Sequence, residues 1–126
     1  MCESRICKRC KIDQPMSQYY DYYVLDKKTE IKRYFKRLQC KLCYSNKAHA
    51  YRYGIPLEKV ESMKAQTNCE ICDKFIPSVS NRYIDHNHLT GKVRGTLCPR
   101  CNGVLQVFED NVELIDKYKQ YLNNNK

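Results

Sequence analysis

The segment best equipped for chemistry lies between residues 83 and 103 and reads YIDHNHLTGKVRGTLCPRCNG. It holds Asp85, His86, His88 and Asn102. Hydrolysis of a phosphodiester needs a base that takes a proton from water and a hard divalent cation that stabilises charge on the phosphate and on the leaving oxygen. Asp85 and the amide oxygen of Asn102 are suitable ligands for Mg²⁺ or Mn²⁺. His86, if neutral near pH 7, suits the role of the base.

These residues also have simpler interpretations. An adjacent Asp–His pair is more often a hydrogen-bonded surface pair than an active site, and His86 with His88 would also suit a mixed Cys/His zinc site. Arg94 would contact either phosphate or solvent. Strand alternation adds a difficulty, because it puts His86 and His88 on one face and Asp85 on the other. For Asp85 and His86 to serve one site, the strand must bend or end there.

Eight of the nine cysteines form four Cys-x-x-Cys pairs, and Cys2 is left over as an unpaired thiol. Two such pairs complete the tetrahedral shell that zinc prefers. The opening residues are too polar for a signal peptide, so we expect reduced thiols that bind metal rather than disulfides. Pairing by adjacency predicts two structural zinc ions, although interleaved pairing stays open. The predicted ligand sets are Cys7, Cys10, Cys40 and Cys43, and Cys69, Cys72, Cys98 and Cys101.

The second zinc set explains how Asn102 reaches Asp85. Cys98 and Cys101 would fix the start of a helix beginning at Pro99, which carries Asn102 beside the hairpin that bears Asp85. A zinc ion with four cysteine ligands has no open position, so it is not expected to be the catalytic metal.

The composition favours a polyanionic partner. The formal net charge is +9, and two zinc ions on eight thiolates would lower it to about +5. Nucleic acid is therefore the first partner to consider, although a solvated lysine-rich face is an equal alternative. No apolar run approaches the roughly 20 residues of a membrane span. The basic cluster is interleaved with Tyr34 and Phe35 and comprises Lys27, Lys28, Lys32, Arg33, Lys36, Arg37 and Lys41.

The elements that must position these residues are short, and the core is expected to be thin. We expect a hairpin between residues 19 and 35, and helices over 40–53 and from Pro56. Strands over 82–85 and 92–97 would be joined by a turn at 87–91, with Gly91 and Gly95 as turn and bulge residues. A C-terminal amphipathic helix would bear Val112, Ile115, Tyr118 and Leu122 and end in a frayed NNNK tail.

The stretch from Tyr53 to Asn102 resembles the phage recombination endonuclease VII family, a branch of the HNH or His-Me finger nucleases. The resemblance rests on YGIPLEKVESMKAQTNCEICDK and IDHNHLTGKVRGTLCPRCN. It implies a ββα-metal unit with one zinc ion on the second cysteine set. Asp85 and Asn102 would hold the catalytic metal, His86 would be the general base, and His88 would contact or polarise the phosphate. It also implies 5′-phosphate and 3′-hydroxyl products, and its fold supplies the bend at the strand end.

These observations predict a small zinc-stapled α+β protein with two domains. Residues 1–53 would form a zinc ribbon-like, basic-aromatic unit, and residues 54–126 a His-Me finger nuclease unit. The predicted function is metal-dependent cleavage of duplex or branched DNA, with an intracellular location, in the cytoplasm of an infected host cell. The alternative is a non-catalytic double-zinc binding or assembly module. RNA as substrate, a homodimer, and phage or host protein partners stay open. The expected nucleic-acid contacts are Arg94, Lys92, Lys32, Arg33, Lys36 and Arg37.

Overall fold

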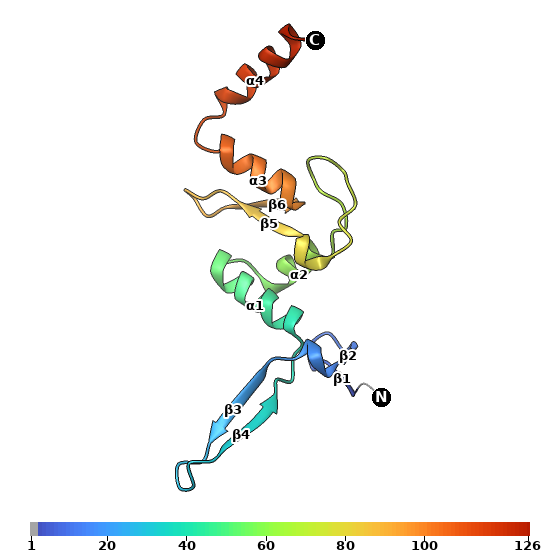
Figure 1. Cartoon of the computed structure of the whole chain (residues 1–126), viewed down its shortest axis with the longest axis vertical. Coiled ribbons are helices and arrows are strands. Elements are labelled where there is room, and N and C mark those ends of the chain that lie inside the picture. The colour runs from blue at the N-terminus through green and yellow to red at the C-terminus, as the bar shows by residue number, and fades with distance from the viewer. Residues whose placement is uncertain (1–2) are drawn as a thin grey trace. The chain divides into compact units, whose positions relative to one another are not determined.

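The computed structural model describes residues 3–126, and Cys2 lies outside them. The chain divides into two compact units, with the division between Arg52 and Tyr53 (Figure 1). The structure is a small α+β fold with two four-cysteine clusters, as the sequence predicts. None of the helices in residues 3–126 is long and apolar enough to cross a membrane.

The first unit contains two antiparallel hairpins and most of a helix. The hairpin expected between residues 19 and 35 is confirmed, and Asp26 closes its turn by accepting backbone N–H groups from Lys28 and Thr29. The shorter hairpin of β1 and β2 was not predicted, because three-residue strands carry too little alternation to be recognised. The elements are β1 (Ser4–Ile6), β2 (Asp13–Pro15), η1 (Met16–Gln18), β3 (Asp21–Leu25), β4 (Lys32–Lys36) and α1 (Lys41–Tyr53).

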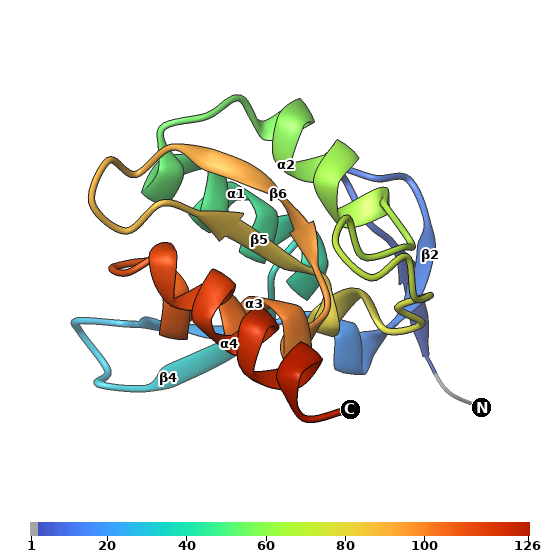
Figure 2. The ribbon, with the colours of Figure 1, turned by 90° about the horizontal axis from the view of Figure 1, so that it is seen from above.

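The second unit has a strand–strand–helix centre with flanking helices. Helix α1 stops at Gly54, whose φ of +60° suits glycine best, and α2 follows Pro56. The strands β5 and β6 contact both α2 and α3, and Figure 2 shows the hairpin lying between these helices. The elements are α2 (Leu57–Ala65), η2 (Val79–Asn81), β5 (Tyr83–His86), β6 (Val93–Leu97), α3 (Pro99–Phe108) and α4 (Glu113–Asn124).

A β-bulge interrupts the β5–β6 hairpin between Asp85 and His86. Asp85 pairs with Gly95, and the next residue, His86, pairs with Val93, so Arg94 is the extra residue. A bulge bends its strand and re-aims the side chains around it. The bulged strand is therefore β6, where Arg94 lies next to the predicted bulge residue Gly95. The register changes between the two residues of β5, Asp85 and His86, for which strand alternation required an irregularity.

The core of the second unit is small, as its length and composition predict. Val60 and Met63 of α2 are buried, and the fully buried Thr96 hydroxyl donates a hydrogen bond to the Met63 carbonyl. A second cluster joins Ile76 and Leu97 to the cysteines of this unit. Helix α4 has no buried residue and extends through Asn124, so the first two residues of the predicted frayed tail are helical instead.

Candidate active site and metal centres

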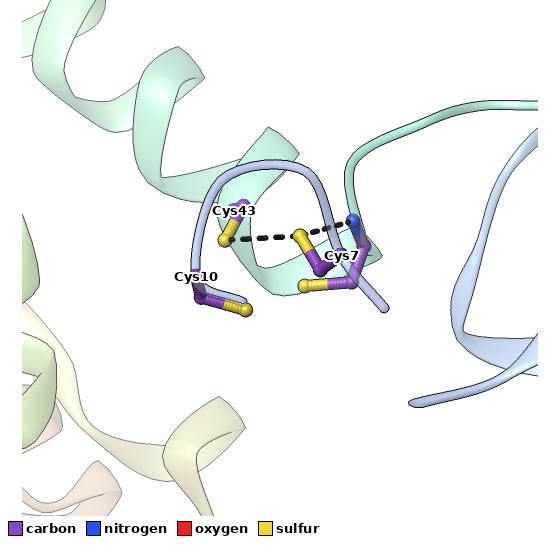
Figure 3. Close-up of side chains that lie close together, drawn as sticks. Cys7, Cys10 and Cys43 are labelled. Carbon is purple, nitrogen blue, oxygen red and sulfur yellow. Dashed lines mark hydrogen bonds between the residues drawn. The ribbon is translucent and has the colours of Figure 1, made fainter. Parts of the chain in front are cut away.

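The eight described cysteines gather into two clusters formed by adjacent pairs. Within each cluster the four sulfur atoms lie within 4.8 Å of one another. The Cys7 and Cys43 sulfurs are 3.9 Å apart (Figure 3), and those of Cys72 and Cys98 are also 3.9 Å apart. Tetrahedral zinc with Zn–S bonds of about 2.3 Å requires S···S separations of about 3.8 Å. The thiols therefore fit a structural metal ion of this kind.

The backbone around each cluster prepares one thiol for metal binding. Burial opposes ionisation of Cys7, but backbone hydrogen bonds, led by that from Cys40, outweigh it and lower its pKa to about 6. Burial likewise opposes ionisation of Cys69, but backbone hydrogen bonds, led by that from Cys72, outweigh it and lower its pKa to about 6. Each cluster thus presents a thiolate at neutral pH, which is the form that binds zinc.

The second cluster fixes the start of helix α3. Cys98 follows the last residue of β6 and is the N-cap of α3, where its sulfur accepts the backbone N–H of Cys101. Asn102, one residue further, donates its backbone N–H to the Cys98 carbonyl. Because α3 contacts both β5 and β6, the metal cluster sets where Asn102 lies relative to the hairpin. Asn102 is therefore held on a rigid element, as the cysteine spacing predicts.

His86 and His88 lie at the end of β5, beside the bulge of the hairpin. The rings of His86 and His88 are 4.8 Å apart at an interplanar angle of 63°. The Tyr53 ring is also close, with its centroid 4.8 Å from that of His86. The imidazole that the sequence predicts to be a general base thus contacts two other rings.

The carboxylate of Asp85 is buried, and Arg94 binds both of its oxygens. The Arg94 Nε–Asp85 Oδ2 distance is 2.6 Å, and the Nη2–Oδ1 distance is 3.0 Å. Such a bidentate pair is among the strongest charge-assisted contacts in proteins. The bulge places Arg94 where it reaches back across the hairpin. Arg94 was predicted to contact nucleic acid. In this structure its guanidinium instead binds Asp85, the predicted metal ligand.

Glu109 joins this network from the end of α3, and sequence reasoning missed it. Its side chain is only 9% exposed. It accepts the backbone N–H of His88 at 3.0 Å, lies 3.1 Å from His88 Nδ1, and lies 3.4 Å from Arg94 Nη1. Glu109 follows Asn102 by seven positions, which is two helical turns, so both project from the same face of α3. That spacing was the one available signal.

Comparison with known proteins shows the family to which the chain belongs. The profile of the recombination endonuclease VII family matches residues 46–124, more than half of the chain. The chain belongs to the recombination endonuclease VII family. No curated protein matches the chain.

A solved structure is also similar to the chain. It is the ββα-Me type II restriction endonuclease Hpy99I, with 25% sequence identity and a TM-score of 0.44. The match covers 98% of this chain and 66% of the Hpy99I chain, so this endonuclease VII-family chain spans just under two thirds of that protein.

A cavity beside Asp85 gives this endonuclease VII-family chain an opening at the site. It has a volume of about 320 Å³ and is lined by Glu70, Ile71, Asp85, Arg94, Gly95, Leu97 and Leu105. Glu70 accepts the backbone N–H of Thr96 and lies so close to Gly95 that a Cβ at that position would clash with its carboxylate. Glycine at this position lets Glu70 approach the bulge. The cavity therefore has two carboxylates and one guanidinium on its wall.

The remaining predicted contact residues lie in two places. Lys92 is exposed in the turn between β5 and β6, which Asn87 closes by accepting the backbone N–H groups of Leu89 and Thr90. Lys32, Arg33, Lys36 and Arg37 belong to the β3–β4 hairpin and its end, in the other unit. Of the predicted site residues, Asp85, His86 and His88 thus lie at or just beyond the end of β5, and Asn102 lies on α3, which contacts the hairpin.

Proposed function

We propose that this chain is a DNA endonuclease that hydrolyses phosphodiester bonds with a divalent metal ion. The observation that carries the proposal is the convergence of Asp85, His86 and His88 at the end of β5, beside the bulge of the hairpin, in a chain of the endonuclease VII family. DNA is the expected polymer because the family is one of recombination endonucleases. Branched and nicked DNA are the substrates to examine first.

His86 would act as the general base. Its ring contacts those of Tyr53 and His88, each with its centroid 4.8 Å away, and these contacts would help to position it. A positioned imidazole can take the proton of the attacking water. His88 would contact a phosphate oxygen, with its ring orientation set by Glu109. Cleavage that leaves a 5′-phosphate and a 3′-hydroxyl is expected.

The oxygen donors of Asp85 and Asn102 suit Mg²⁺ or Mn²⁺, which prefer carboxylate and carbonyl ligands. A divalent ion held there would stabilise charge on the scissile phosphate and the leaving oxygen. Arg94 covers both oxygens of Asp85, so it must move aside for that ligand set to form. Its side chain is 37% exposed and also faces Glu109, which gives the guanidinium another partner when it leaves. The cysteine clusters would hold zinc as structural ions.

The alternative is a double-zinc binding module without turnover, and one observation favours it. Asp85 already has a bidentate partner, as it would in a purely structural ion pair. The two functions differ in their response to the removal of that carboxylate. A binding module keeps its affinity for DNA and has no activity to lose, whereas an endonuclease loses its turnover.

The proposed function is tested by replacing Asp85 with asparagine. Supercoiled plasmid, linear duplex and branched DNA are incubated with wild-type protein and either Mg²⁺, Mn²⁺ or Ca²⁺. Wild type is expected to cleave with Mg²⁺ or Mn²⁺, and Asp85→Asn to be about 10²–10³-fold slower, because the charged ligand is lost. Asp116→Asn, an exposed carboxylate of α4, is the matched control and should retain the wild-type rate. Absence of cleavage by wild type on every substrate, or equal rates for wild type and Asp85→Asn, would refute the proposal.

Glu109→Gln is expected to slow cleavage about tenfold, a typical loss when the residue that orients an active-site histidine is changed. Glutamine can still accept the His88 backbone N–H but cannot pair with a cation. The measurement is single-turnover cleavage together with thermal unfolding, with the exposed Glu113→Gln as control. A loss of rate that merely follows a loss of folded protein would show that Glu109 is structural and does not position His88.

A further inference from the structure

The β3–β4 hairpin presents aromatic side chains to solvent on both of its faces. All five residues of β3 are exposed, and so are the first four of β4. Tyr34 is 70% exposed and Tyr23 is 55% exposed. Exposed rings in such number need an explanation, since apolar patches on monomers commonly mark interaction sites.

The rings are arranged as cross-strand pairs, one on each face. Tyr22 pairs with Phe35, with ring centroids 5.6 Å apart, and Tyr23 pairs with Tyr34 at 6.1 Å on the opposite face. The rings in each pair are tilted by 32° and 53°, so they do not cover one another's flat surfaces by stacking. Such pairs stabilise the hairpin, yet all four aromatic residues stay exposed, from 37% for Tyr22 to 70% for Tyr34.

Cations accompany the rings on both faces. The Lys32 ammonium lies 4.8 Å from the centre of the Tyr23 ring, and the Arg37 guanidinium lies 4.8 Å from that of Tyr22. Arg33 and Lys36 lie on the same strand, and Lys36 pairs with the carboxylate of Asp21, whereas Arg33 has no such partner within residues 3–126. The hairpin therefore combines exposed aromatic surface with an excess of positive charge.

This combination fits a strand of nucleic acid whose bases are unpaired. Phosphates satisfy the cations, and each base offers a flat face to an aromatic ring. An intact duplex hides those faces inside its stack and offers a β-ribbon only base edges and phosphates. Charge alone would suit either form of DNA, but the rings favour unpaired nucleotides.

We propose that the β3–β4 hairpin is a stacking platform for unpaired nucleotides and directs the protein to DNA with single-stranded or branched segments. This inference rests on the proposed function for the identity of the polymer. It names the substrate class through a surface that belongs to the first unit, whereas the proposed active site belongs to the second.

The test measures binding by fluorescence anisotropy with the full zinc-loaded chain and Ca²⁺, so that binding is separated from turnover. The probes are a single strand, an abasic strand of equal length, an intact duplex and a gapped duplex. Wild type is expected to bind the base-containing strand about 10- to 100-fold more tightly than the abasic strand, as stacking of one or two bases would give. It should also prefer the gapped to the intact duplex.

Two sets of variants test whether the preference for base-containing strands depends on the tyrosines or on the cations. The double variant Tyr23→Leu/Tyr34→Leu is expected to bind both strands with nearly equal affinity, while Tyr51→Leu, a 93% exposed tyrosine of α1, keeps the difference. Lys32→Ala/Arg33→Ala should weaken binding to both strands alike, because phosphates are common to them. Zinc content and circular dichroism confirm that each variant is folded.

Equal wild-type affinity for base-containing and abasic strands would overturn the inference, as would equal affinity for intact and gapped duplex. Tyrosine-dependent binding to phosphatidylserine vesicles without any base preference would also overturn it and indicate a membrane surface. These results are independent of cleavage. If the protein cleaves DNA but binds base-containing and abasic strands equally, only the proposed stacking platform is refuted. If it prefers base-containing strands but does not cleave, only the proposed endonuclease activity is refuted.

Discussion

Replacing His86 with alanine is expected to slow DNA cleavage by about 10²–10⁴-fold, the usual contribution of a general base. No other imidazole is placed to substitute fully, because His88 is engaged by Glu109 and its ring lies across that of His86. The variant should bind DNA as wild type does, since it keeps Asp85, Arg94 and the hairpin.

The measurement is single-turnover cleavage at saturating protein, over a range of pH. His49→Ala is the matched control, because His49 is the one remaining histidine and lies on α1 in the first unit. It should retain the wild-type rate. A His86→Ala protein that is folded and cleaves at the control rate would remove His86 from the mechanism and leave the identity of the base unassigned.

Loss of the metal ion from the second cysteine cluster is expected to unfold the second unit and abolish cleavage. The apolar core there is thin, and Cys69 is among its most buried residues. Structural zinc binding supplies about 10–16 kcal/mol, against total stabilities of about 5–15 kcal/mol for whole domains. A core of this size cannot replace such a contribution.

Cys72→Ser tests this expectation, and Cys10→Ser is its counterpart in the first unit. Native mass spectrometry should find two zinc ions in wild type and one in each variant. Hydrogen exchange should show loss of protection in residues 53–126 for Cys72→Ser, with cleavage lost, and in the first unit alone for Cys10→Ser. Full protection of the second unit in a Cys72→Ser protein with one zinc ion would show that its core suffices without metal.

The features that the sequence predicts well are those with local signals. Four Cys-x-x-Cys pairs predict the clusters because two residues between thiols suit one tight knuckle, and the short loops favour adjacent pairing. Gly54 predicts the end of α1, and Asn87 with Gly91 predicts the turn between β5 and β6. Each of these depends on the conformation of a few neighbouring residues.

The features that it does not predict depend on contacts between elements. Arg94 reaches Asp85 only because the bulge makes it the extra residue of β6, and a pattern of alternation cannot show which residue is skipped. Glu109 approaches His88 because α3 lies beside the hairpin, and its seven-residue spacing from Asn102 indicates a shared helix face but not this contact. The sequence predicts that α4 is amphipathic, but it does not identify what would cover its apolar face, which is exposed in this structure.

The ion pair between Arg94 and Asp85 has a consequence for how the protein would meet its ligands. A divalent ion at Asp85 would compete with Arg94, and a DNA phosphate would join Glu109 as a partner for the displaced guanidinium. The two ligands are then thermodynamically linked, and DNA should tighten metal binding by the same factor by which the metal tightens DNA binding. Without DNA, such a nuclease would bind its metal ion weakly and would be inactive. Binding of DNA would then raise the affinity for the metal ion and so activate the enzyme.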